Sequence, residues 1–163
     1  MDRTSLPPGS IEAGRAYDAA LRALGLKPDG LLWAWDKTIE HYVLVLLTEH
    51  FDFAGPLRIY ETLTRAYNTS VTPSEISPFI VRVHSPRQAF IQNLPIADVG
   101  PVGGGRSEDM VLTTDTSTLT FTNHWVYYWP ESLGNRGLVR RREPTARNRE
   151  WARFERNVMK RAA

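Results

Sequence analysis

The chain has 163 residues, of which 42% are hydrophobic and 23% charged, a composition typical of one globular domain and not of a disordered or fibrous protein. It contains no cysteine, which excludes disulfides, thiolate metal sites and a cysteine nucleophile. The longest apolar run, residues 42–47, is too short to cross a bilayer, and the polar leader lacks the apolar stretch of a secretory signal. These features predict a cytoplasmic protein with no membrane span.

The net charge of +2 is unevenly distributed along the chain. Residues 136–163 contain ten Lys and Arg and three Asp and Glu, a net charge of +7, whereas residues 1–135 contain ten and fifteen, a net charge of −5. A basic end on an acidic body indicates either an arm for a polyanion or a segment that docks on its own domain. The charge pattern leaves both interpretations open.

In chain order, the first predicted element is an amphipathic helix that Ser10 is expected to cap and Gly25 to end. Two apolar runs, residues 31–35 and 42–47, then predict a β-hairpin whose second strand is covered on both faces. A second amphipathic helix is expected to open at Gly55-Pro56.

Two capping-box patterns follow, at residues 72–75 and 85–88. The first predicts a short helical turn and the second a short helix, with a strand at residues 79–84 between them. A Pro- and Gly-rich stretch from residue 95 then predicts a long exposed connection.

Beyond this connection, the chain is rich in β-branched and aromatic residues at positions 110–114, 118–122 and 124–129, which predicts a small antiparallel extension of the sheet. Pro144-Thr145 precede a final helix of about fifteen residues. The expected fold class is α+β: a mixed or antiparallel sheet with packed helices in an αββα-βα core, a β-rich extension and a basic amphipathic C-terminal helix. The expected organisation is a flexible leader (1–9), an α/β core (10–94), a connector (95–109), a β extension of the same domain (110–133) and a basic C-terminal segment (134–163).

No motif identifies a cofactor or a catalytic group. Residues 100–107 have the glycine spacing of a phosphate-binding loop, but arginine stands where lysine belongs, and Glu108-Asp109 and a β-type run follow where a helix is required. The four histidines lack the local spacing of metal ligands. We therefore expect no cofactor and no metal, and the sequence favours a protein that is not an enzyme.

The Arg87 corner, formed by His84, Ser85 and Arg87, is a candidate anion site. His84 is expected to end a strand directly before a helix capped by Ser85, with Arg87 in its first turn. Backbone amides, an imidazole and a guanidinium would then converge on a phosphate or carboxylate, or serve acid–base chemistry with a carboxylate partner. The structural alternative is an ordinary strand-to-helix corner in which Ser85 only caps.

An aromatic run places Trp125, Tyr127 and Trp129 on one face if it forms a strand. Such rings stack on bases in single-strand binders, but they equally fill a core or form a protein interface. The sequence favours core packing and keeps stacking and an intermolecular contact as alternatives.

The terminal helix has two faces. Its apolar stripe consists of Trp151, Phe154 and Val158, and the basic ridge nearly opposite consists of Arg149, Arg153, Arg156 and Lys160. The stripe is expected to pack on protein, leaving the ridge free for a nucleic-acid backbone or an acidic protein. The structural alternative is a surface helix whose arginines pair with Glu150 and Glu155 or with the acidic body.

The leading hypothesis is a non-enzymatic accessory or binding protein that contacts an anionic partner, with nucleic acid favoured, through its basic C-terminal segment. The expected contacts are Arg140, Arg141 and Arg142 together with the basic ridge. The first alternative is a protein–protein interaction module, a homodimer or hetero-complex, that uses the aromatic run and the terminal helix. The second is a small enzyme or anion-binding protein at His84 and Arg87.

Overall fold

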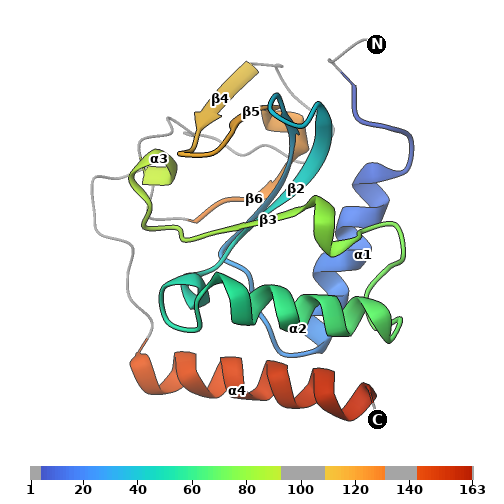
Figure 1. The fold of residues 1–163 in the computed structure, drawn as a ribbon, viewed down its shortest axis with the longest axis vertical. Coiled ribbons are helices and arrows are strands. Elements are labelled where there is room, and N and C mark those ends of the chain that lie inside the picture. The colour runs from blue at the N-terminus through green and yellow to red at the C-terminus, as the bar shows by residue number, and fades with distance from the viewer. Residues whose placement is uncertain (1–4, 93–108, 131–142, 163) are drawn as a thin grey trace.

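A computed structural model describes residues 5–92, 109–130 and 143–162 of the chain. Within them, six strands form one mixed sheet in the order β3-β2-β1-β5-β4, and β6 also pairs with β1. Figure 1 shows α2 and α4 side by side below the sheet, with α1 along its right-hand side. The predicted α+β class is confirmed.

The first predicted helix is confirmed as α1 (Ser10–Ala23), which buries Tyr17 and Leu21. The prediction that Ser10 caps it is wrong, because Gly9 occupies the cap position and no side chain caps the helix. The other end is as predicted: Gly25 has φ 98°, and the amide of Leu26 donates to the Leu21 carbonyl at 3.0 Å. A left-handed residue at this position is usually glycine, since it has no Cβ to clash.

The predicted hairpin is confirmed as β1 (Gly30–Asp36) and β2 (His41–Leu47), paired antiparallel along their whole length. The last five residues of β2 are buried, as expected for a strand covered on both faces. On β1, the Trp33 indole donates to the Ser10 carbonyl and to Tyr127 Oη, each at 3.0 Å, which attaches α1 to the sheet. Gly14 permits this approach, because a Cβ there would lie 2.6 Å from Tyr127 Cζ.

The connection from β2 to the parallel strand β3 (Val81–His84) carries the second predicted helix, α2 (Pro56–Asn68), between the 3₁₀ turns η1 (Glu49–Asp52) and η2 (Pro78–Ile80). The strand is shorter than predicted because η2 takes the expected first residues. In the preceding loop, the expected cap of Thr72 does not form: its buried hydroxyl has no hydrogen-bond partner in the part of the chain that the structure describes.

The outer edge of β3 is closed by a side chain of α2. Tyr60 Oη donates to the Val81 carbonyl at 2.9 Å and accepts from the Val83 amide at 3.0 Å. An open sheet edge invites pairing with another chain, and covering it removes that risk. Tyr60 therefore fixes α2 on the sheet and closes the edge at once.

The second capping box forms as predicted. Ser85 Oγ accepts from the Arg87 amide at 3.1 Å, and Gln88 Oε1 accepts from the Ser85 amide at 3.0 Å. The regular helix that follows, α3 (Ala89–Gln92), is a single turn and begins four residues after Ser85. The expected connector lies mostly in residues 93–108, outside the described residues.

The β-rich extension is confirmed as β4 (Asp109–Thr113), β5 (Thr118–Thr122) and β6 (Val126–Tyr128), with the 3₁₀ turn η3 (Asn123–Trp125) interrupting the third predicted strand. Its strands β5 and β6 pair antiparallel with β1, so β1 is central in the sheet. The terminal helix α4 (Pro144–Arg161) has 18 residues, slightly more than expected.

Candidate functional site

The terminal helix docks on its own domain through the apolar stripe. Trp151, Phe154 and Val158 are only 8%, 0% and 1% exposed. Trp151 and Phe154 also pack against each other, with ring centroids 5.5 Å apart. The prediction that this stripe packs on protein is confirmed, and the protein is the chain itself.

Polar contacts hold one side of α4 against the turn between α1 and β1. Glu150 Oε1 accepts from the Lys27 amide at 2.7 Å, and Asn157 Nδ2 donates to the Leu24 carbonyl at 2.9 Å. Each contact reaches a backbone group, so the position does not depend on a flexible partner side chain. These bonds fix the rotation of α4 about its axis.

The other side of α4 is held by α2. Arg58 forms two hydrogen bonds with the Glu155 carboxylate, at 2.5 and 2.6 Å, and these bonds raise the pKa of the Arg58 guanidinium. The guanidinium of Arg65 contacts the Met159 sulfur. A bidentate arginine–carboxylate pair has a fixed geometry, so it specifies how the two helices lie side by side.

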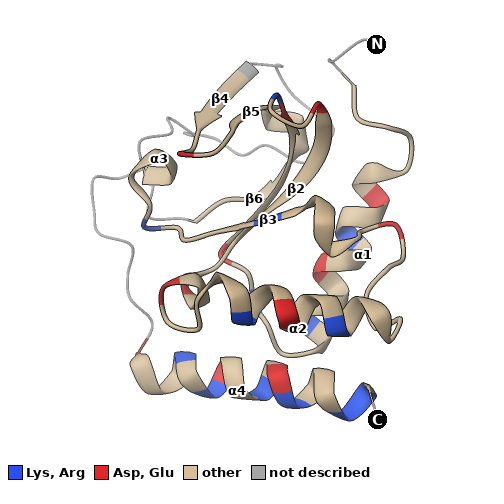
Figure 2. Ribbon diagram, viewed as in Figure 1, with Lys and Arg blue, Asp and Glu red and all other residues tan. Residues whose placement is uncertain are grey.

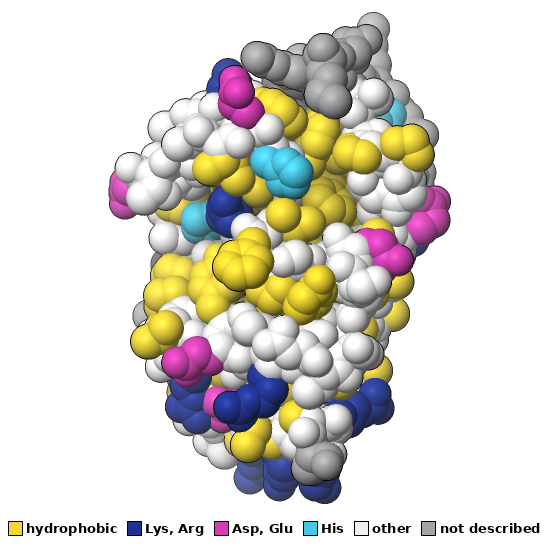
Figure 3. Space-filling view, turned by 45° about the vertical axis from the view of Figure 1, so that its right-hand side comes forward, with side chains coloured by type: hydrophobic (Ala, Val, Ile, Leu, Met, Phe, Trp, Pro, Cys, Tyr) yellow, Lys and Arg dark blue, Asp and Glu magenta, His cyan; other side chains and the backbone are white. Residues whose placement is uncertain are grey.

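With both sides held, the basic ridge faces solvent. Arg149, Arg153, Arg156 and Lys160 are all exposed, and Figure 2 shows Lys and Arg along the length of α4. In a second view, Lys and Arg gather at the lower end of the molecule, where α4 lies (Figure 3). Among the described residues, no ridge side chain forms an ion pair.

The acidic residues of α4 do not neutralise this ridge. Glu155 bonds Arg58 of α2, and Glu150 contacts Lys27 and lies 3.6 Å from His50 Nε2. None of these contacts is with a ridge arginine, and the alternative of a surface helix whose arginines pair with Glu150 and Glu155 or with the acidic body stays a prediction. Arg140, Arg141 and Arg142, the other expected contacts, lie outside the described residues and stay a prediction.

The aromatic run does not form a single exposed face. Trp125 lies in η3, is buried and packs edge-on against Tyr42, with centroids 5.8 Å apart. Trp129 is buried, and Tyr127 Oη donates to the Ile11 carbonyl at 2.7 Å. Burial raises the pKa of Tyr127 to about 12. These positions fit the core-packing interpretation, because a sheet gains most by burying its largest rings.

In the Arg87 corner, the three residues face different partners. The His84 ring packs edge-on against Phe90 with centroids 5.3 Å apart, and burial is the main cause of its lowered pKa. Ser85 is fully buried and donates to Asp52 Oδ2 at 2.8 Å. His84 has no ion pair with a carboxylate among the residues that the structure describes.

Arg87 itself lies between two carboxylates of η1. Its guanidinium nitrogens are 3.6 Å from Glu49 Oε2 and 3.7 Å from Asp52 Oδ2. These acids follow β2, whereas Arg87 follows β3, and the parallel pairing of the two strands brings their ends together. The hypothesis of an anion site here stays a prediction, and it requires an anion to compete with both carboxylates.

Sequence reasoning missed a buried polar group where η1 meets the start of α4. The Arg147 guanidinium lies 3.0 Å from the centroid of the Phe53 ring, and His50 lies 5.5 Å from Trp151, ring to ring. Arg147 is only 6% exposed although it stands in a strongly basic segment. The position of Arg147 could have indicated its burial, because it lies one helical turn before Trp151 and therefore on the same face as the apolar stripe.

Comparisons with protein-family models, with curated proteins and with solved structures found no significant match for this chain. In the described ranges, no group of three or more His, Asp or Glu side chains is placed to hold a metal ion. A search of the same ranges found no helix with both the length and the apolar character of a membrane span.

Proposed function

We propose that this protein binds nucleic acid through the basic ridge of α4, by neutralising backbone phosphates. The observation that carries the proposal is the separation of charges on one helix: four exposed cations on the outer face, and both glutamates in contact with the body. Cations that form no ion pair need not break one to contact a phosphate.

The dimensions of the ridge support this proposal. From Arg149 to Lys160 the helix rises about 16 Å, a length over which one strand of a DNA duplex presents about five phosphates. The helix is held on both sides, so the backbone that carries the cations is positioned before binding and only their side chains lose conformational entropy. Phosphate contacts carry no base information, and we expect little preference for base sequence.

The test is a fluorescence-anisotropy titration of the full chain with labelled single-stranded and duplex oligonucleotides at several salt concentrations. Four phosphate contacts give a slope of log K against log [salt] of between about −3 and −4 on duplex DNA. The double variant Arg153→Gln/Arg156→Gln is expected to reduce this slope by about one per lost contact.

The matched control is Arg15→Gln/Lys37→Gln, which removes the same charge from exposed positions outside α4. It is expected to leave the slope nearly unchanged. Absence of binding at low salt would refute the proposal. Equal weakening by the two double variants would show that net charge, and not the ridge, drives binding.

A further inference from the structure

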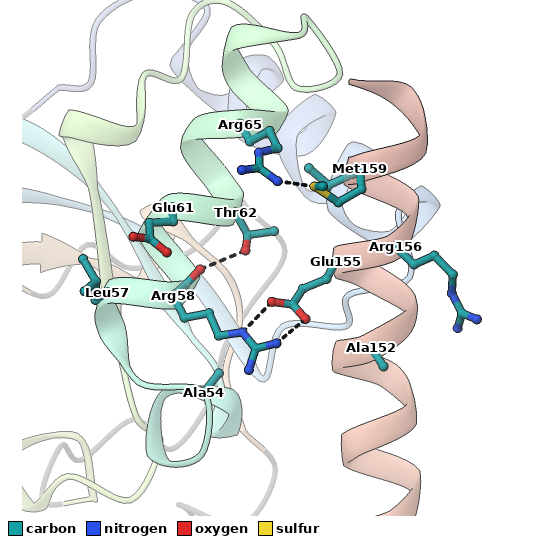
Figure 4. Close-up of a pocket in the computed structure, with 11 residues that line it drawn as sticks. Ala54, Leu57, Arg58, Glu61, Thr62, Arg65, Ala152, Glu155, Arg156 and Met159 are labelled. Carbon is teal, nitrogen blue, oxygen red and sulfur yellow. Dashed lines mark hydrogen bonds and ion pairs between the residues drawn. The ribbon is translucent and has the colours of Figure 1, made fainter. Parts of the chain in front are cut away.

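A groove of about 670 Å³ runs between α2 and α4, beside the basic ridge. Figure 4 shows two contacts that cross it: Arg58 reaches Glu155, and Arg65 reaches Met159. Ala152, a small residue, lines the α4 wall beyond the Arg58–Glu155 contact, on the side away from Met159. The groove is therefore an open channel along two helices that the crossings hold at a fixed spacing.

Aliphatic side chains line this groove and remain exposed. Leu57 on the α2 wall is 72% exposed and Met159 on the α4 wall is 53% exposed. Grooves between helices commonly receive the apolar face of another helix, and methionine adapts its shape to such partners. Among the lining residues there is no aromatic ring on which a nucleic-acid base could stack.

The charge around the groove is positive. Arg65 and Arg156 line it, and neither forms an ion pair in the described part of the chain. Glu155 is bound by Arg58, which leaves Glu61 as the one lining carboxylate outside an ion pair of the described residues. The basic ridge next to the groove adds to the same field. A complementary partner is therefore acidic as well as apolar.

We propose that the α2–α4 groove binds an acidic amphipathic helix of a partner protein. The apolar face of that helix covers Leu57 and Met159, and its carboxylates face Arg65. Arg156 extends from the outer side of α4, away from α2, and adds positive charge at the rim (Figure 4). This site differs from the nucleic-acid surface, because it combines aliphatic contacts with charge, whereas the ridge offers charge alone. Arg156 is the residue common to the two surfaces.

The probe is a labelled synthetic helix with leucine at every third and fourth position and glutamate at the others, titrated into the full chain by fluorescence anisotropy. A peptide of the same composition in scrambled order is the reference for unspecific charge attraction. Leu57→Glu replaces an exposed apolar side chain of the groove by a carboxylate. The position is in the first turn of α2, where a negative charge stabilises a helix, so the variant should fold. Ile39→Glu makes the same change at an exposed residue of the β1–β2 turn.

We expect the amphipathic peptide to bind about tenfold or more tightly than the scrambled one. Leu57→Glu should remove this difference and Ile39→Glu should keep it. Equal binding of the two peptides would overturn the proposal. A monomer–dimer equilibrium that Leu57→Glu abolishes would also overturn it, because the groove would then bind a second copy of the chain.

An oligonucleotide titration of the same variants separates this proposal from the function proposed above. If Leu57→Glu weakens oligonucleotide binding more than Ile39→Glu does, the groove belongs to the nucleic-acid surface and the peptide proposal is wrong. If neither variant changes oligonucleotide binding, and peptide binding still depends on Leu57, the two surfaces act separately.

Discussion

The cations of the basic ridge and the single guanidinium of the Arg87 corner lie in opposite electrostatic surroundings. The ridge arginines form no ion pair among the described residues, whereas Arg87 lies 3.6 and 3.7 Å from two carboxylates. Both groups are candidate anion contacts when only the sequence is known. The structure shows that the availability of a cation depends on which acids the fold brings beside it.

The cause lies in how each segment is held. Arg149, Arg153, Arg156 and Lys160 are on the far side of a helix from its buried stripe, so the same packing that fixes α4 leaves them exposed. Arg87 follows a strand, and strand pairing places it against the residues that follow the neighbouring strand. A docked helix exposes its polar face, whereas a strand end is surrounded by other chain segments.

The largest effect is expected from the stripe that positions the ridge. Phe154→Ala removes a fully buried ring and should lower the free energy of unfolding by about 3–5 kcal/mol, because it loses apolar burial and leaves a cavity. Chemical denaturation of the variant and the wild type measures this difference.

Asn148→Ala is the matched control, since it changes an exposed position of the same helix and should alter the free energy of unfolding by less than about 0.5 kcal/mol. Equal changes in the free energy of unfolding for the two variants would mean that α4 is not docked on the domain. The ridge would then not be held in a fixed position, as the comparison with Arg87 requires.

A smaller effect is expected from the acids that enclose Arg87. Asp52→Ala removes the acceptor of the buried Ser85 hydroxyl and one of the two carboxylates beside Arg87. A buried donor left without an acceptor costs about 1–3 kcal/mol, and thermal or chemical unfolding should show a loss in that range.

Ser85→Ala and the double variant complete a cycle around this bond. In the Ser85→Ala background the hydroxyl is absent, so Asp52→Ala should cost less there than in the wild type. Strict additivity of the two single changes would show that the Ser85–Asp52 hydrogen bond contributes nothing to the free energy of unfolding.

Periodicity within one element carried much of what the sequence could predict. The stripe and the ridge of α4 follow from spacings of three and four residues, because helix geometry is local and the same in every context. The hairpin and the buried strand β2 follow in the same way from alternation and apolar run length.

Contacts between elements distant in the sequence were beyond prediction. Glu49 and Asp52 meet Arg87 because β2 and β3 pair in parallel, and no local pattern specifies that pairing. Likewise, β5 and β6 join the free edge of β1, which makes the predicted extension part of the central sheet. The burial of Arg147 depends on Phe53, which is 94 residues away in the chain.

The smallest of the three effects concerns His84, next to the enclosed Arg87. Burial is the main cause of its lowered pKa; the charge of Arg82 also lowers it, and a hydrogen bond with Gln88 raises it. The unfolded chain has an ordinary histidine pKa of about 6.5, so below that pH it binds more protons than the folded protein. The stability that comes from keeping His84 neutral is therefore complete above about pH 6.5, and it is lost as the pH falls through the pKa of His84 in the folded protein.

His84→Gln removes the titrating group and should remove this part of the pH dependence. The difference in unfolding free energy between wild type and variant is expected to be constant above about pH 7. Below that pH, the wild type should lose stability relative to the variant. Urea unfolding at several pH values measures it, and NMR titration of the His84 ring gives its pKa in the folded protein directly. The opposite result, a wild type that becomes more stable than the variant as the pH falls, would mean that a carboxylate stabilises protonated His84. The Arg87 corner would then contain an acid–base pair, although the His84 ring packs against Phe90.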